Sequence, residues 1–388
     1  MRLQSLAFCE AKNEPSQWDF ECLDLNDVNL IVGMNASGKT RTLNVLHSLA
    51  ALLAGRRHSS LLSARFIAKF AGPPPSRKPI EYSVVTEPSR VYSERLVIAG
   101  KDVLTRSKSG RGSIRAEKLT QKLVRQMIPF KVPVNQVAVF AKRDSLQHPF
   151  LEPLYRWGES VLYLRFGTPM GKAQFFAVES SALKKQQSPD VNNPTVTFLS
   201  GVNRFGVSKF VRPIIQDMNA VGFPVTDINV KPPTTIRIQS SLGNVVSLSA
   251  DESDLTCETD QNSMSDGMFR TLAVLVHIQH ALLANPNPVI LIDDIGEGLD
   301  YERSNALIKV TRKKAIAKKI QVVMTTNDRH VMNNVPLQEW HVLERKGQSV
   351  TFHNYGNSKA VFDEFMFTGM SNFDFFHSGM FSEARAEN

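Results

Sequence analysis

Hydrophobic positions along the chain follow two spacings, and together they predict a mixed α/β protein. Short runs rich in Val, Ile, Leu and Phe predict strands over residues 3–8, 20–25, 28–32, 80–85, 89–104, 134–140, 289–292 and 321–324. Apolar residues at helical spacing predict helices over residues 40–54, 61–70, 115–127, 271–283 and 309–319. Residues 234–239 and 244–248 predict a hairpin around Leu242 and Gly243.

These elements divide the chain into four predicted segments. Residues 1–105 and 236–355 carry the clearest strands and are expected to form the two halves of one core. Residues 106–235 give mixed signals, and we interpret them as a largely helical insertion that begins with a basic loop over 106–112. Residues 356–388 form a C-terminal tail.

The tail is dense in phenylalanine, which is costly to leave in water. Its aromatic residues are Phe362, Phe365, Phe367, Phe373, Phe375, Phe376 and Phe381. Two interpretations stay open: the tail packs against the chain's own core or insertion, or it docks on a partner protein or a second subunit.

Composition places the chain among ordinary globular proteins, because 42% of its 388 residues are hydrophobic and 21% are charged. Cys9, Cys22 and Cys257 show neither metal-binding spacing nor a disulfide framework, which favours a reducing compartment. The N-terminus lacks a signal-peptide pattern, and no apolar run approaches the ~20 residues that span a bilayer. We therefore expect a cytoplasmic protein without a membrane partner.

Net charge is +9 at pH 7, which permits a DNA or RNA partner without requiring one. The basic segments 106–125 and 309–319 are the candidate nucleic-acid surfaces. For both segments a solvated helix face is the simpler interpretation.

The most specific motif lies between the strand at 28–32 and the helix at 40–54. Its sequence fits G-x-x-x-x-G-K-[ST] at every fixed position, in the strand–loop–helix context that the motif needs. Glycines let backbone N–H groups approach a phosphate, and a helix N-terminus favours an anion. Lys39 is expected to reach the β- and γ-phosphates, and Thr40 to place its hydroxyl on Mg²⁺. The predicted nucleotide-binding residues are Gly33, Asn35, Ala36, Ser37, Gly38, Lys39 and Thr40.

A second motif closes such a site, because the apolar strand at 289–292 ends in Asp293 and Asp294. A parallel strand beside the first delivers its terminal carboxylates to the sheet edge that carries the phosphate loop. Asp293 is expected to hold Mg²⁺, and Asp294 to orient or deprotonate the attacking water.

The order of motifs resembles that of ABC-type ATPases, and among them the stand-alone AAA-family ATPases related to OLD proteins and to RecF and SMC heads. The matching residues are Gly33 to Thr40, Ser265-Asp266-Gly267 with Arg270, Asp293-Asp294, Leu299-Asp300 and Thr325-Thr326-Asn327. The match covers residues 1 to about 60 and 235 to 345. It implies a P-loop ATPase core with a mostly parallel sheet flanked by helices, an antiparallel β subdomain, and ATP and Mg²⁺ as cofactors.

The resemblance also implies that two heads close around ATP. Ser265, Gly267 and Arg270 belong to the signature that contacts the γ-phosphate bound by the other subunit, and Asp300 lies near the same interface. Because the chain has one phosphate loop, two complete sites require a homodimer or higher oligomer. From the residues alone, Ser265 or Asp266 equally fits a helix N-cap.

Two positions depart from the family pattern. Asp294 stands where a catalytic Glu is usual, and Asn327 stands where a switch His is usual. Asn cannot carry the charge of an imidazolium. Glu297 could supply a compensating carboxylate, and Asp328 or His330 could also contribute. We assign Asp294, Glu297 and Asn327 as the catalytic group and expect slow turnover with ATP binding as a switch.

ATPases of this resemblance act as sensor or motor subunits in bacterial anti-phage systems, with the effector in a separate chain; this role is a fold-level analogy. An ATP-gated DNA-binding clamp in repair and a nearly inactive regulatory nucleotide-binding protein are the alternatives. For stacking of the adenine ring, the sequence offers Phe8, Trp18 or Phe20.

Overall fold

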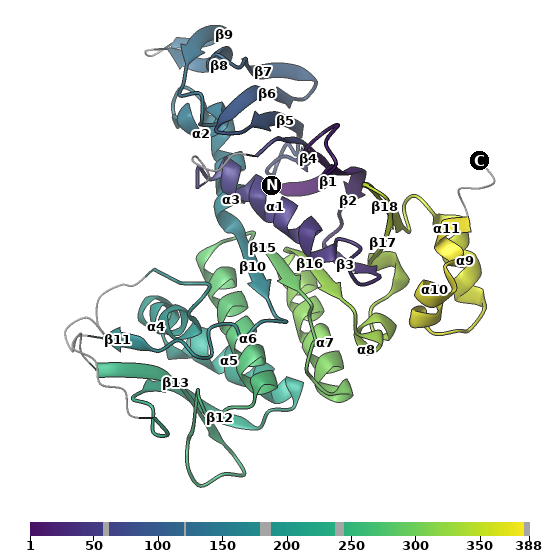
Figure 1. The fold of residues 1–388 in the computed structure, drawn as a ribbon. Coiled ribbons are helices and arrows are strands. Elements are labelled where there is room, and N and C mark those ends of the chain that lie inside the picture. The colour runs from purple at the N-terminus through teal and green to yellow at the C-terminus, as the bar shows by residue number, and fades with distance from the viewer. Residues whose placement is uncertain (57–61, 120–121, 179–187, 237–243, 384–388) are drawn as a thin grey trace. The chain divides into compact units, whose positions relative to one another are not determined.

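The computed structural model of the protein describes residues 1–56, 62–119, 122–178, 188–236 and 244–383 (Figure 1). Its residues form two compact units. The first unit contains Met1–Val161, Leu337–Met370 and Asp374–Asn388, and the second contains Leu162–Pro336 and Ser371–Phe373. Both units contain helices and strands, which confirms the mixed α/β class.

The first unit is built on one large sheet, with strands in the order β3-β17-β18-β2-β1-β4-β5-β6-β7-β8-β9. β3 is parallel to β17 and β18 is parallel to β2, whereas the pairs from β2 to β9 are antiparallel. The strands are β1 Arg2–Glu10, β2 Trp18–Asp24, β3 Val28–Gly33, β4 Ala64–Ala71, β5 Pro79–Glu87, β6 Arg90–Ile98, β7 Lys101–Arg106, β8 Arg111–Leu119, β9 Lys122–Lys131, β17 Trp340–Lys346 and β18 Ser349–Asn354.

The first unit also contains helices, of which the last three form the C-terminal tail. The helices are α1 Lys39–Leu53, α2 Ala138–Ala141, η1 Pro149–Leu151, α3 Glu152–Ser160, η3 Leu337–Glu339, α9 Lys359–Phe367, α10 Asn372–Ser378 and α11 Met380–Glu383. α3 packs closely on α1 because Gly158 has no side chain. A Cβ at Gly158 would lie 2.6 Å from the carbonyl oxygen of Ala50.

The second unit has two sheets. One sheet contains, as neighbours, the strands β10 Val161–Arg165, β15 Val289–Asp293 and β16 Gln321–Thr326. In it β15 is parallel to β16. The other contains β11 Phe176–Val178, β13 Asn244–Glu252, β12 Val225–Lys231 and β14 Thr259–Asp260. The helices are α4 Pro194–Phe205, α5 Val207–Val221, α6 Asp266–Ala284, α7 Tyr301–Lys318 and α8 Arg329–Asn333.

α6 is a long apolar helix of 19 residues. By length and composition alone it could cross a membrane, but 72% of its most apolar window is buried inside the protein. Burial of this kind is ordinary for a core helix, because a core helix is apolar on most of its faces.

The helix predicted over residues 61–70 is wrong, because residues 64–71 form β4. Phe66, Ala68 and Phe70 are buried, whereas Arg65 and Lys69 are exposed. Phe66 and Phe70 are four positions apart, a spacing that fits a helix as well as a strand. Ala68, midway between them, is buried on the same face. This period of two residues is that of a strand and not that of a helix.

The helix predicted over residues 115–127 is also wrong, because β8 and β9 form an antiparallel hairpin in which Arg115 lies opposite Met127. The predicted loop at 106–112 is the end of β7, a turn and the start of β8. This part of the predicted insertion is therefore strand rather than helix, whereas the domain boundaries stay a prediction. The side chains of Lys118, Lys122 and Arg125 lie outside the described residues.

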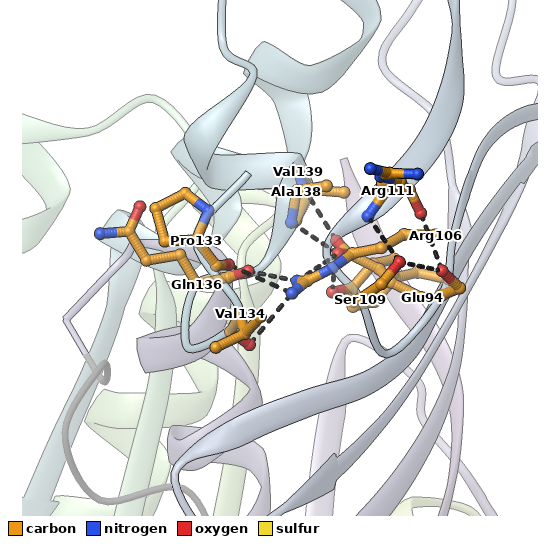
Figure 2. A network of polar contacts seen from close by, with 11 residues as sticks. Glu94, Arg106, Ser109, Arg111, Pro133, Val134, Gln136, Ala138 and Val139 are labelled. Carbon is orange, nitrogen blue, oxygen red and sulfur yellow. Dashed lines mark hydrogen bonds and ion pairs between the residues drawn. The ribbon is translucent and has the colours of Figure 1, made fainter. Parts of the chain in front are cut away.

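The strand predicted over residues 134–140 is wrong for a reason that Figure 2 makes plain. Arg106, whose side chain is fully buried, donates to the main-chain carbonyls of Pro133 at 3.1 Å, Val134 at 3.0 Å and Gln136. The carbonyl of Val134 also accepts from the N–H of Val91 in β6 at 2.8 Å, so the guanidinium and β6 together hold this turn. Residues 138–141 then form α2 instead of continuing as a strand.

Glu94 completes the same buried network. Its carboxylate accepts from the N–H groups of Ala138 at 2.5 Å and Val139 at 2.9 Å, which begin α2, and lies 3.7 Å from Arg106 (Figure 2). Tyr82 donates to it at 3.1 Å. Burial raises the pKa of Glu94, opposed by these hydrogen bonds and by the charge of Arg106. The network fixes α2 on the antiparallel sheet.

The hairpin predicted around Leu242 and Gly243 lies partly outside the described residues. β13 begins at Asn244 and pairs with β11, β12 and β14.

Candidate nucleotide-binding and hydrolysis site

The phosphate loop joins β3 to α1, and its backbone enters the left-handed region at two positions. Ala36 has a φ of 60° and Gly38 a φ of 118°. Turns of this kind form concave sites in which backbone N–H groups bind anions. A Cβ at Gly38 would lie 3.0 Å from the ring of Trp18, so both conformation and space require glycine there.

Lys39 is held inside the loop. It is 6% exposed, and its ammonium donates to the carbonyls of Gly33 at 2.8 Å and Met34 at 3.1 Å. Ser37 is also 6% exposed, and its hydroxyl has no hydrogen-bond partner among the described residues. A buried hydroxyl without a partner is costly unless a ligand supplies one.

These features fit a triphosphate. The loop offers backbone N–H groups at the N-terminus of α1, the Lys39 charge and the Ser37 hydroxyl, which are the donors that phosphate oxygens accept from. Asn35 and Ala36 are exposed in the same loop, and Thr40 is exposed in the first turn of α1. Thr40 is the hydroxyl that would hold Mg²⁺, which prefers oxygen ligands.

In the second unit, Thr325 fixes both carboxylate residues at the end of β15. Its hydroxyl donates to Oδ1 of Asp293 at 2.7 Å and accepts from the N–H of Asp294 at 2.9 Å. Asp293 is 5% exposed, whereas Asp294 is half-buried. Thr325 therefore orients one carboxylate directly and the other through its backbone.

Asp294 has a φ of 53°, a conformation that L-residues rarely adopt. Such a residue costs about 1–3 kcal/mol and persists only where the surrounding structure enforces it. Asp tolerates this region better than Glu because its short side chain can bond locally. The backbone thus gives a physical reason for Asp at a position where the family pattern has Glu.

Glu297 lies next to Asp294 around Gly167. A Cβ at Gly167 would lie 2.4 Å from Oε2 of Glu297 and 3.3 Å from Cβ of Asp294. Glu297 is exposed in the turn that follows β15. The second unit therefore places the two carboxylate side chains predicted to be catalytic close to the same glycine.

Sequence reasoning missed Tyr163 and Arg165 of β10. Burial and the neighbouring Asp293 carboxylate raise the pKa of Tyr163 to about 12. The guanidinium of Arg165 lies 5.2 Å from the centre of the Tyr163 ring. A signal existed, because residues 162–165 alternate aliphatic and polar-tipped side chains as a strand does. Nothing in the sequence, however, places that strand beside Asp293.

Ser265 is the N-cap of α6, where its hydroxyl accepts from the N–H of Met268 at 3.2 Å. The side chain is exposed, so capping leaves it at the protein surface. Asp266 follows it and pairs with Lys172 at 2.7 Å. The signature and N-cap interpretations of Ser265 are therefore compatible.

The rest of the signature packs on the turn after β15. A Cβ at Gly267 would lie 2.8 Å from the side chain of Leu299, and Arg270 donates to the carbonyl of Glu297 at 3.3 Å. Asp300 follows as the N-cap of α7. The second unit thus brings Gly267, Arg270, Glu297 and Asp300 into one region.

Asp300 and Asn327 both lie exposed at the ends of elements. Asp300 accepts from the N–H of Arg303 at 2.9 Å and pairs with its guanidinium at 3.0 Å, contacts that lower the pKa of Asp300. Asn327 follows β16, and the next residue, Asp328, caps α8 by accepting from the N–H of His330 at 2.7 Å. Asp328 therefore has a structural role in the cap.

Each predicted site residue belongs to one unit. The phosphate-loop residues are in the first unit, and the signature, the carboxylates, Asp300 and Asn327 are in the second. The N-terminal aromatics proposed to stack on adenine are core residues of the first unit: Phe8 is 5%, Trp18 0% and Phe20 2% exposed.

No protein-family model and no curated protein matches the sequence. Among solved structures, an SMC head bound to the C-winged helix domain of ScpA superposes with a TM-score of 0.55, covering 93% of this chain and all (100%) of that chain at 11% identity. The protein has the fold of an SMC head domain.

Two further SMC heads are similar. One, derived from Pyrococcus furiosus, has an extended coiled coil and is bound to the C-terminal domain of ScpA; its TM-score is 0.49 at 12% identity, with 94% of this chain and 99% of that chain covered. The other, from Thermotoga maritima, gives 0.44 at 13% identity, with 91% and 99% covered. The SMC-head fold agrees with the resemblance found in the sequence, and at these identities the likeness concerns the fold alone.

Proposed function

We propose that this protein is a Mg²⁺-dependent ATPase that closes as a dimer around ATP and turns over slowly. The observation that carries the proposal is the phosphate loop, in which Lys39 is buried and the Ser37 hydroxyl has no partner among the described residues. The SMC-head fold supports it, because the order of the sequence motifs resembles that of the same group.

Replacement of Lys39 by Ala tests this proposal directly. The change removes a charge-assisted contact to the phosphates, so we expect the affinity for Mg-ATP to fall about ten- to a hundredfold. Isothermal titration calorimetry measures the affinity. Lys101→Ala, an exposed lysine of β7 in the same unit, is the matched control and should bind as the wild type does. Equal affinities of Lys39→Ala and wild type would contradict nucleotide binding at this loop.

Hydrolysis is assigned to the second unit's carboxylates. Mg²⁺, when bound, polarises the phosphates and offsets their charge. Thr40 and Asp293 would hold the ion, and Asp294 accepts the proton of the attacking water, with Glu297 as a second carboxylate. Asn327 contributes a hydrogen bond but no charge. A short base at position 294 and an uncharged switch residue support slow turnover.

Dimer closure is the second half of the proposal. Ser265 and Asp300 are exposed, as an ATP-dependent interface requires. We expect Ser265→Arg to abolish the ATP-dependent dimer. The long arginine side chain would keep this surface from closing on the ATP bound by the other subunit. Light scattering after gel filtration measures the mass in Mg-ATP, on an Asp294→Asn background that slows turnover.

Ser253→Arg places the same side chain on an exposed turn of the same unit and should leave the dimer intact. A Ser265→Arg protein that still doubles its mass with ATP would rule out a signature role for this serine.

The proposed function also includes a partner protein in a separate chain. In the SMC head of the same fold, the head is bound to the C-winged helix domain of ScpA. We propose that this chain likewise serves a separate protein as a sensor or motor subunit, in bacterial anti-phage defence by the resemblance. The repair-clamp alternative receives less support, because Lys314 of the basic helix is paired with Asp217 at 2.7 Å.

A further inference from the structure

A cavity of about 380 Å³ lies beside the phosphate loop, within the first unit. Loop residues 34–37 form one side, and residues 343–345 at the end of β17 form another. The third side comes from the C-terminal tail, which contributes Phe376 and Phe381. The phosphate loop, a sheet strand and the tail therefore enclose one space.

The tail presents these two rings beside a small core formed by Phe362, Phe365 and Phe375. Phe375 is 0% exposed and packs on Phe362 and Phe365, with ring centres 4.7 Å and 4.8 Å away. Phe376, the next residue, is half-buried. Its ring is nearly parallel to that of Phe381, with 6° between the planes and 6.4 Å between the centres. The tail's own stability thus rests on Phe375, whereas Phe376 faces the cavity.

The lining of the cavity also contains a cation next to the phosphate loop. Arg345 lines the cavity and donates to the carbonyl of Ala36 at 3.4 Å. Burial and the charge of Arg345 together lower the pKa of Arg41, which follows the loop in α1. Glu344 adds a carboxylate to the lining. A space lined by the phosphate loop, a guanidinium beside it and flat aromatic rings suits a molecule with an anionic end and a flat ring.

We propose that the nucleotide's base stacks on Phe376, with Phe381 behind it, so that the C-terminal tail forms the aromatic wall of the nucleotide site. This proposal rests on phosphate binding at Lys39. The N-terminal aromatics do not compete for this role, because Phe8, Trp18 and Phe20 contact one another in the core. Stacking on an aromatic face suits any base, since every base has a π-face.

The test compares Mg-ATP with Mg-tripolyphosphate, which carries the phosphates without the base. We expect Phe376→Ala to weaken Mg-ATP binding about tenfold, at the low end of what base stacking contributes, and to leave tripolyphosphate binding unchanged. Phe367→Ala is the matched control, because Phe367 belongs to the same tail but is 91% exposed and does not line the cavity. It should change neither affinity. Calorimetry on the full chain measures all of them.

A second variant guards against loss of the tail's fold. Phe376→Trp keeps an aromatic face, so it should retain wild-type affinity for Mg-ATP, and its fluorescence should be quenched by Mg-ATP and not by tripolyphosphate. The proposal is overturned if Phe376→Ala binds Mg-ATP as the wild type does, or if it weakens ATP and tripolyphosphate equally. Failure of the proposed function looks different: there, Lys39→Ala would leave both ligands' affinities unchanged.

Discussion

Replacing Asp294 by Asn is expected to lower the rate of ATP hydrolysis by about 10²–10⁴-fold while Mg-ATP still binds. The substitution removes the carboxylate that accepts the proton of water. It keeps the backbone, because Asn tolerates the left-handed conformation that Asp294 adopts at a φ of 53°. Thr325 still accepts from the N–H of residue 294, so Asp293 should keep its orientation.

Phosphate release under saturating Mg-ATP measures this rate, and Asp254→Asn, an exposed residue after β13 in the same unit, is the control. Undiminished turnover in Asp294→Asn would contradict the assignment of Asp294 as the base and would make Glu297→Gln the next variant.

The same Asp294→Asn protein should hold the closed, ATP-bound dimer. In a pull-down from its native cell it should retain a stoichiometric effector chain, whereas recovery of nuclease-sensitive DNA would favour the repair clamp.

Replacing Arg106 by Ala is expected to destabilise the first unit by about 3–5 kcal/mol. The change leaves the fully buried Glu94 carboxylate without its cation and removes the guanidinium that donates to the carbonyls of Pro133, Val134 and Gln136. Unpaired buried groups of this kind cost more than an ion pair contributes. Urea unfolding followed by circular dichroism measures the shift.

Arg95→Ala supplies the comparison, because Arg95 lies on the neighbouring strand β6 and pairs with Asp102 at 2.6 Å in an exposed setting. Solvent screens that pair, so its loss should leave stability almost unchanged. Adding Glu94→Gln to Arg106→Ala should recover part of the lost stability, because the uncompensated charge disappears. Equal unfolding midpoints for Arg106→Ala and Arg95→Ala would show that the buried network does not stabilise this sheet.

The errors of sequence interpretation share one cause. Phe66 and Phe70 fit both helical and strand spacing, and residues 115–127 mix basic and apolar positions without a decisive period. In both cases strand pairing made the choice, because β4 lies between β1 and β5, and β8 pairs with the strand that follows it, β9. At residues 134–140 the deciding partners were two buried side chains, Arg106 of β7 and Glu94 of β6, which hold the turn and the start of α2.

The sequence by itself determined the features whose chemistry is local. A phosphate loop needs its glycines, its Lys39 and the strand and helix around it within one continuous stretch, so G-x-x-x-x-G-K-[ST] can be recognised without a fold. The apolar run that ends in Asp293 and Asp294 is local in the same sense. Only the tertiary structure decided which distant residues serve these motifs. Packing between elements far apart in the chain places Thr325 and Tyr163 beside Asp293, and Phe376 beside the phosphate loop. Spacing along a sequence carries no record of such contacts.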